Sequence, residues 1–184
     1  MDAYHVLMVH FPIALWMTAT LAILFRVFSD GPRAKSVAQA LVPLLGASLV
    51  FGVIAFLIGL MVWPWETISS SALGRNHVLL ASWTVSYWAA ILYVLWRRGE
   101  VVWQGAARWI MAALAILGSA LLGITGTLGG HLVGIYTDVS ALLRMMGWEV
   151  YTTYYVPNMT LIALGVISLL LLVMGFWSRK AKAT

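Results

Sequence analysis

The chain has 184 residues, of which 62% are hydrophobic and only 9% charged, and its mean hydropathy is +0.95. A soluble globular domain is about 45–50% apolar and about 25% charged. A chain of this length cannot bury so large an apolar excess, because a small domain leaves much of its surface exposed. The excess must therefore face lipid, which excludes a soluble enzyme.

Cysteine content and net charge exclude further classes of protein. The chain has no cysteine, so disulfides, thiolate zinc sites, cysteine-held iron–sulfur clusters and covalently attached c-type haem are excluded. The formal net charge is +5. In a membrane protein such an excess is typical of cytoplasmic loops, so we expect no nucleic-acid partner.

Five apolar segments are long enough to span a bilayer, which takes about 20 residues. In chain order they lie near residues 9–28, 41–62, 78–96, 109–128 and 159–177. The connections between the first four are short and leave no room for a soluble domain. We therefore predict an all-α integral membrane protein, a five-helix bundle that forms a single transmembrane domain over residues 1–184.

Basic residues are unevenly distributed between the two sides of this predicted bundle. One side receives nine of the eleven, namely Arg26, Arg33, Lys35, Arg97, Arg98, Arg108, Arg179, Lys180 and Lys182. The other side receives only Arg75 and Arg144. Because Lys and Arg accumulate in cytoplasmic loops, this bias predicts an N-out, C-in protein that crosses the bacterial inner (cytoplasmic) membrane several times.

The outer connection from Leu132 to Val156 is the longest in the chain. Its segment from Ser140 to Trp148 is apolar on most of a helical surface, which predicts a short interfacial helix between the fourth and fifth spans. Aromatic residues gather on the same side, among them Trp63, Trp65, Tyr136, Trp148, Tyr151, Tyr154 and Tyr155. A lipid-facing aromatic belt explains them, and so does contact with a periplasmic or membrane redox subunit.

All four histidines, His5, His10, His77 and His131, lie at the outer ends of predicted spans. Ionisable side chains at membrane depth are costly and usually face the bundle interior or a cavity. On a helix His5 and His10 point about 140° apart, which suits two separate partners better than one small ion. Neutral imidazoles commonly hold haem iron, so we predict axial ligands to one or two b-type haems. Interfacial histidines bonded to water or backbone are the alternative.

Small residues lead along the fourth predicted span towards His131. Gly123, Gly126 and Gly130 thin this helix, so that another helix can approach its backbone closely. A flat porphyrin could lie against the same backbone. Close haem packing and close helix packing both remain open at this point.

A weak internal repeat is present in the sequence. His10-x5-Trp16 and His77-x5-Trp83 match in residue type and spacing, and each begins a span that starts on the outer side. The repeat suggests two helical hairpins of similar shape, followed by a fifth helix.

Three short motifs resemble a family of small bacterial membrane proteins of unassigned function. The opening His5-Val-Leu-Met-Val-His10-Phe-Pro-Ile-Ala-Leu15 is similar to the HPLLVHFPIAL with which its members commonly begin, although Val6 replaces a proline. His77 and the element Gly129-Gly-His-Leu-Val133 match two further motifs of the family. Members are sometimes fused to Rieske or cytochrome c modules, so the resemblance implies an association with respiratory electron transfer. It provides no catalytic residues.

Taken together, the sequence predicts a membrane-embedded b-type haem electron-transfer subunit, or anchor, of a hetero-oligomeric respiratory complex. It would relay electrons on the periplasmic side between the quinone pool and a redox partner, and a quinone site remains an option. Two alternatives stay open: a cofactor-free structural or assembly subunit, and a copper-handling protein that uses the histidines and the nine methionines. The sequence holds no Ser-His-Asp set and no paired carboxylates near a span, so we predict no standalone enzyme and no catalytic residues.

Overall fold

The structure, a computed structural model, describes residues 2–154 together with residues 162, 165, 166 and 169. The chain divides into two units, residues 1–153 and residues 154–184, and the description below concerns the first. The predicted fifth span, residues 159–177, lies outside the described residues except for those four single positions.

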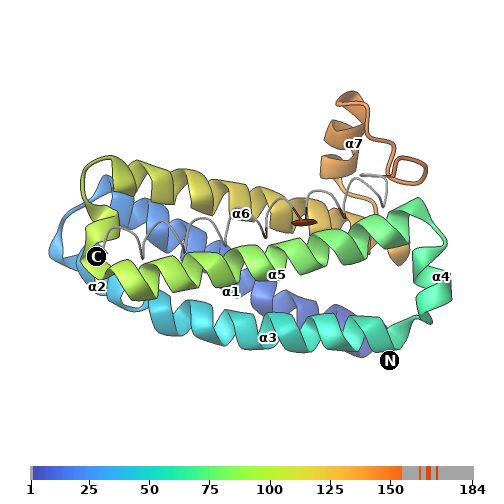
Figure 1. Cartoon of the computed structure of the whole chain (residues 1–184), viewed down its shortest axis with the longest axis horizontal. Helices are drawn as coiled ribbons and strands as arrows, with labels where there is room; N and C mark the ends of the chain where they lie inside the picture. Colours follow the sequence, from blue (N-terminus) through green and yellow to red (C-terminus); the bar gives the residue numbers. More distant parts are fainter. Residues whose placement is uncertain (1, 155–161, 163–164, 167–168, 170–184) are drawn as a thin grey trace. The chain divides into compact units, whose positions relative to one another are not determined.

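Four long helices make up the first unit (Figure 1). They are α1 (Asp2–Phe28), α3 (Leu41–Val62), α5 (Ala72–Arg98) and α6 (Gly105–Leu132). Each is long and apolar enough to cross a membrane. The first four predicted spans are therefore confirmed as helices, although α1, α5 and α6 extend a few residues beyond the predicted bounds.

Short helices connect the long ones, namely α2 (Pro32–Gln39), α4 (Trp65–Ser69) and the 3₁₀ helix η1 (Gly99–Trp103). A further short helix, α7 (Asp138–Met145), follows α6. The predicted short helix after the fourth span is confirmed by α7. Local chemistry sets the ends of α5: the Ser71 hydroxyl accepts a hydrogen bond from the Gly74 amide over 3.0 Å, and Gly99 ends the helix with a positive φ of 49°.

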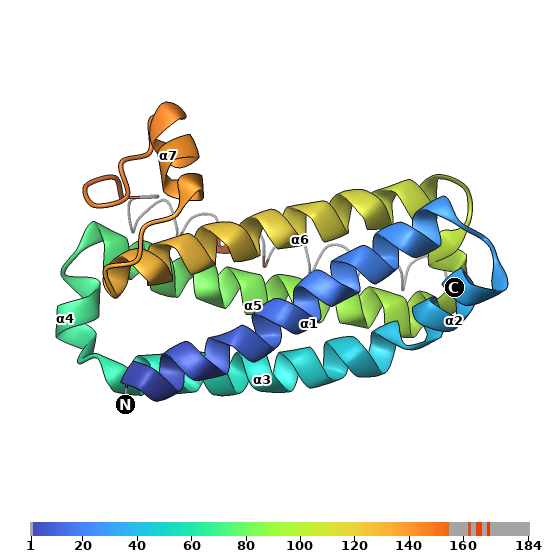
Figure 2. The same cartoon turned by 180° about the vertical axis from the view of Figure 1, so that it is seen from behind.

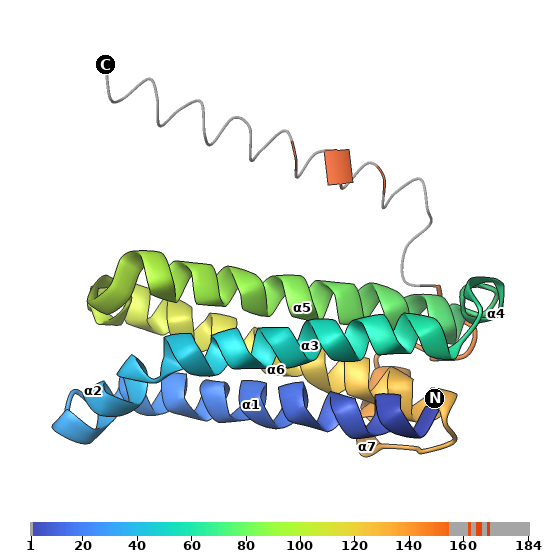
Figure 3. The same ribbon diagram turned by 90° about the horizontal axis from the view of Figure 1, so that it is seen from below.

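The long helices form an antiparallel four-helix bundle (Figures 2 and 3). Both α1 and α5 pack against α3 and α6. The starts of α1 and α5 therefore meet the ends of α3 and α6 at one end of the bundle, which we call the His end because all four histidines lie there. The opposite end, which we call the basic end, holds Arg26, Arg33, Lys35, Arg97, Arg98 and Arg108.

The bundle is held by a narrow apolar core. Trp16, Ile23, Trp88 and Ala115 are almost fully buried between the four helices. Large apolar side chains cover the outside of the same helices, for example Leu21 with 65% of its surface exposed. An apolar exterior around an apolar core is what a bundle surrounded by lipid requires.

Candidate functional site

His5 is held by α3 from the first turns of α1. Its Nδ1 lies 3.1 Å from the carbonyl oxygen of Ala55. The ring approaches the backbone one turn further along α3, at Gly59, where an added Cβ would come within 2.7 Å of the His5 Cε1. The glycine is therefore required for this ring position.

His77 is held in the same way by the other pair of helices. It lies in the second turn of α5, and its Nδ1 is 3.1 Å from the carbonyl oxygen of Thr125 on α6. One turn further along α6 is Gly129, where an added Cβ would come within 2.8 Å of the His77 Cε1. A carbonyl and a glycine four residues later thus position each imidazole.

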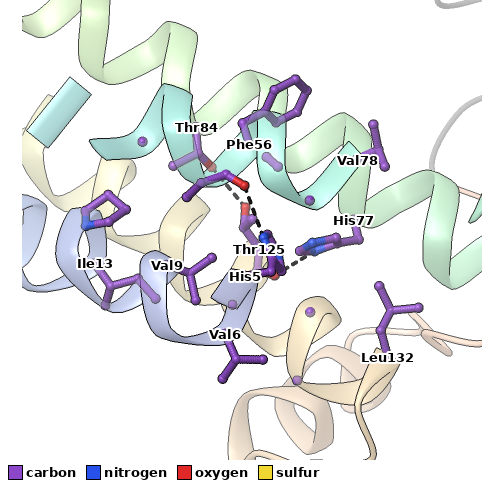
Figure 4. Close-up of a pocket in the computed structure, with 18 of the residues that line it drawn as sticks. His5, Val6, Val9, Ile13, Phe56, His77, Val78, Thr84, Thr125 and Leu132 are labelled. Carbon is purple, nitrogen blue, oxygen red and sulfur yellow. Dashed lines mark hydrogen bonds between the residues drawn. The ribbon is translucent and has the colours of Figure 1, made fainter. Parts of the chain in front are cut away.

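These contacts fix the tautomer of both rings. A carbonyl oxygen only accepts, so in the neutral ring Nδ1 carries the proton and donates it to the backbone. Nε2 then keeps its lone pair and is the atom available to a metal ion or to a hydrogen-bond donor. Figure 4 shows the His77 ring extending towards His5 inside one cavity.

The cavity lies inside the His end of the bundle and has a volume of about 330 Å³. Ligand pockets span about 300–1,000 Å³. Its walls are mainly apolar, with Val9, Ile13 and Phe56 among them, and Trp16 lies at its inner end. Beside the histidines, polar side chains come from Thr84, Thr125 and Thr137, and the Thr84 and Thr125 hydroxyls are hydrogen-bonded over 2.9 Å. The space is therefore suited to an apolar, ring-shaped group that offers something for imidazole to bind.

His10 lies in the lining of the same cavity but differs from the first two histidines. Its side chain is exposed at the side of α1. Its Nδ1 is 2.6 Å from the Val6 carbonyl oxygen of its own helix, so Nε2 again keeps its lone pair. His10 therefore lies at the edge of the cavity, away from His5 and His77.

His131 is outside the cavity lining. It is 6% exposed, and its Nδ1 lies 2.8 Å from the hydroxyl of Tyr151. Its ring meets the rings of Tyr136 and Tyr151 edge-on. The structure therefore brings His5 and His77 together and places His131 in a separate contact with the segment that follows α7.

The three candidate glycines of α6 also differ in whether they line the cavity. Gly126 and Gly130 line the cavity, whereas Gly123 does not. An added Cβ at Gly123 or Gly126 would meet no other atom within 4 Å. Neither of these two glycines is therefore required for tight helix packing within the described part of the chain.

Metal-ligating side chains are sparse in the described residues. Among residues 2–154 no group of three or more His, Asp or Glu side chains lies close enough to hold a metal ion. No methionine lines the cavity, and Met145 and Met146 are 85% and 74% exposed. A copper site of mixed His and Met ligands has no counterpart in this part of the chain.

Sequence reasoning missed the groups that position the two rings. The Ala55 and Thr125 carbonyls are backbone atoms and carry no sequence signal. Gly59 and Gly129 do carry one, because they follow Ala55 and Thr125 at the same spacing in the two hairpins. An alignment on His5 and His77 pairs the two glycines only with a gap of two residues, since Gly59 follows His5 by 54 residues and Gly129 follows His77 by 52.

The fold and this cavity define the protein as a multi-pass helical membrane protein. Its residues 1–139 match the family described as "Predicted membrane protein (DUF2231)", and because the match covers most of the chain, the protein belongs to that family. The description of this family names no function, which agrees with the resemblance found in the sequence. No curated protein and no solved structure matches the chain significantly.

Proposed function

We propose that the protein is a membrane-embedded electron-transfer subunit that binds one b-type haem between His5 and His77. The observation that carries the proposal is the pair of imidazoles in one cavity, with both Nδ1 atoms engaged by backbone carbonyls, so that the Nε2 atoms keep their lone pairs. Metal-ligating histidines characteristically donate the other ring N–H in this way.

The ligand type and the apolar walls support this group. Neutral imidazole is a common axial ligand of haem iron, and a b-type haem needs no cysteine. The walls are mainly apolar, and the buried Trp16 lies at the inner part of the cavity. When bound, the haem would supply one-electron chemistry, while the chain binds and orients it and sets the polarity around it.

One haem is proposed rather than two. A second bis-histidine site would need His10 and His131 to face each other, but His10 is at the cavity edge and His131 is engaged by Tyr151. These two side chains therefore belong to other contacts.

The two alternatives are less well supported. Copper handling would require a cluster of soft ligands, and the described methionines lie away from the cavity. A purely structural subunit would not need an internal cavity, since helical interiors normally close-pack to the density of organic crystals. Two oriented imidazoles in such a cavity favour a bound group.

The proposed location and partners follow from the position of the pair. If the basic end faces the cytoplasm, the His end lies on the periplasmic side of a bacterial inner membrane. Electrons would then enter and leave on that side, from the quinone pool and to a redox subunit of a larger complex. We propose this assembly on the charge bias and on the family resemblance.

The test is the absorption spectrum of the purified protein in detergent. We expect a Soret band and sharp α-bands on reduction. His5→Ala and His77→Ala should lose them, and added imidazole should restore them in part. The matched controls are His10→Ala and His131→Ala, which should keep the spectrum. A colourless wild-type protein expressed with ample haem, or full spectra in both ligand variants, would refute the proposal.

A further inference from the structure

We propose that the side of the cavity between α1 and α6 binds the ring of a lipid-soluble quinol, with the His10 Nε2 accepting a hydrogen bond from a ring hydroxyl. We call this region the α1–α6 mouth and define it by Val9, His10 and Ile13 on α1 and by Gly126 and Gly130 on α6. The role as electron donor rests on the proposed function, whereas the binding itself does not.

His10 is the first observation. Its side chain is exposed in a helix that is long and apolar enough to span the membrane. Ionisable groups at such positions are costly and mark functional sites. Its Nδ1 is held by the Val6 carbonyl, and among residues 2–154 no ion pair engages it. With Nδ1 held by this carbonyl, Nε2 is the ring atom that can accept a hydrogen bond beside the cavity.

The opposite wall of the mouth includes bare backbone at Gly126. Gly126 and Gly130 line the cavity, and a Cβ at Gly126 would meet nothing within 4 Å, whereas one at Gly130 would come within 3.0 Å of the Ile135 carbonyl oxygen. Helix α6 therefore leaves open space above its backbone at Gly126. We place the planar ring there, with Val9 and Ile13 of α1 as the apolar side chains of the mouth.

We place the entry of the ligand on the bilayer side, beside α1. Trp63, Trp65 and Ile68, from the α3–α4 connection and α4, line its outer end, and the buried Trp16 lines its inner end. The neighbouring surface of α1 is lipid-facing, with Leu7 60% exposed. A ligand that enters beside α1 has to be soluble in lipid.

The acceptor character of His10 selects the reduced ligand. A quinol has hydroxyl hydrogens to donate, whereas the oxidised quinone and the dimethyl ether of the quinol have none. A sterol could enter from lipid as well, but its puckered, methyl-bearing rings do not lie on the backbone at Gly126 as a planar ring does. The quinol ring is the ligand class that uses the acceptor, the open space at Gly126 and the lipid access together.

The experiment measures binding of radiolabelled decyl-benzoquinol to the full-length protein in nanodiscs, with its dimethyl ether as the matched ligand. We expect the wild-type protein to bind the quinol better than the ether. His10→Ala should weaken quinol binding by about threefold to tenfold, the value of one hydrogen bond, and should remove the preference over the ether. Leu7→Ala, a lipid-facing change one turn away, should have no effect.

A second pair of variants tests the mouth without touching His10. Gly126→Leu places a side chain into the cavity and should abolish quinol binding. Gly123→Leu adds the same side chain to the same helix, also into open space but away from the cavity, and should leave binding unchanged. Equal affinity for quinol and ether, or unchanged binding in both His10→Ala and Gly126→Leu, would overturn the proposal.

Haem content measured on the same samples separates this inference from the proposed function. Quinol binding that depends on His10 in a protein without haem would support the mouth and refute the haem subunit. A haem protein in which the quinol and its ether bind equally would refute the mouth and leave the haem assignment intact.

Discussion

Trp16 and Trp88 stack on each other in the middle of the bundle, with ring centroids 6.0 Å apart and ring planes 8° from parallel. Each tryptophan lies eleven residues after a histidine of the cavity: Trp16 follows His5, and Trp88 follows His77. The stacked pair therefore marks the contact between two similar hairpins, α1–α3 and α5–α6.

The same relationship extends to the helices that these residues face. A Cβ at Gly52 would come within 2.8 Å of the Trp16 ring, and one at Gly118 within 2.9 Å of the Trp88 ring. Each hairpin thus uses a glycine under its tryptophan and another under its histidine. The glycines let large rings pack against bare helix backbone.

The glycines beneath the imidazoles provide the first prediction. Gly59→Ala and Gly129→Ala should displace the His5 and His77 rings from their carbonyl partners, because the new Cβ would overlap ring atoms. Losing this support should weaken haem affinity by about 10–100-fold, as for other groups that orient a metal ligand. Haem titration of the purified variants is the measurement.

Gly46→Ala is the matched control for these variants. It lies on α3, and its Cβ would meet nothing within 4 Å, so it should bind haem as the wild type does. If Gly59→Ala and Gly129→Ala also titrate like the wild type, the two rings are not held as axial ligands.

Much of the fold was predictable from the sequence because membrane spans are a local property. About 20 apolar residues must form a helix in lipid, where each backbone polar group needs an internal partner. The span predicted at residues 41–62 coincides with α3 (Leu41–Val62). Helix ends in the polar loops were less predictable, since caps such as Ser71 act through single hydrogen bonds.

The grouping of the histidines was less predictable, because it depends on helix rotation and on the partners that each helix meets. The repeat was predicted between His10-x5-Trp16 and His77-x5-Trp83, but Trp83 is 58% exposed whereas Trp88 is fully buried. The structural repeat instead relates His5 to His77. Apolar helices look alike in sequence, and only packing distinguishes one register from another.

His131 and Tyr151 provide the second prediction. Tyr151→Phe removes the hydroxyl that bonds the His131 Nδ1, and the buried Nε2 already has no partner among the described residues. A buried His131 ring without hydrogen-bond partners should lower the free energy of unfolding by about 1–3 kcal/mol. Hydrogen exchange should rise in residues 138–153, which Asn76 also ties to α5 through the Thr153 carbonyl.

The haem spectrum distinguishes this role from ligation. Tyr151→Phe and His131→Ala should both loosen the segment after α7 and leave the spectrum unchanged. Tyr4→Phe, an exposed tyrosine on α1, should change neither property. A lost spectrum in His131→Ala at normal stability would show that this histidine is a ligand after all.

The basic end provides a pH-dependent prediction. Arg26 is 4% exposed, lies with its Cζ 5.5 Å from the centre of the Trp103 ring, and forms an ion pair with Asp30. The hydrogen bond from Arg26 lowers the pKa of the Asp30 carboxyl, and the charge of Arg108 adds to this effect. A lowered pKa means that the ionised form is favoured by folding.

The stability from Asp30 should therefore be present above the usual aspartate pKa of about 3.9 and be lost as the pH falls through the lower value in the folded protein. Thermal unfolding in detergent should show a decrease below about pH 4 that Asp30→Asn removes. Asp30→Asn should also destabilise the protein at neutral pH more than Glu100→Gln, since Glu100 lies further from Arg26, at 3.6 Å. Identical pH profiles for the wild type and Asp30→Asn would contradict this.

The orientation of the bundle in the membrane provides the last prediction, and the absence of cysteine from the sequence makes it directly measurable. Met145→Cys, on α7 at the His end, and Lys35→Cys, on α2 at the basic end, each place one exposed thiol on one side of the membrane. The bias of basic residues predicts that a membrane-impermeant maleimide labels Met145→Cys in cells with a permeable outer membrane. Lys35→Cys should react only after the inner membrane is opened, and a reporter fused after Thr184 should read cytoplasmic. The reverse labelling pattern would place the His end, and with it the proposed haem and quinol sites, on the cytoplasmic side.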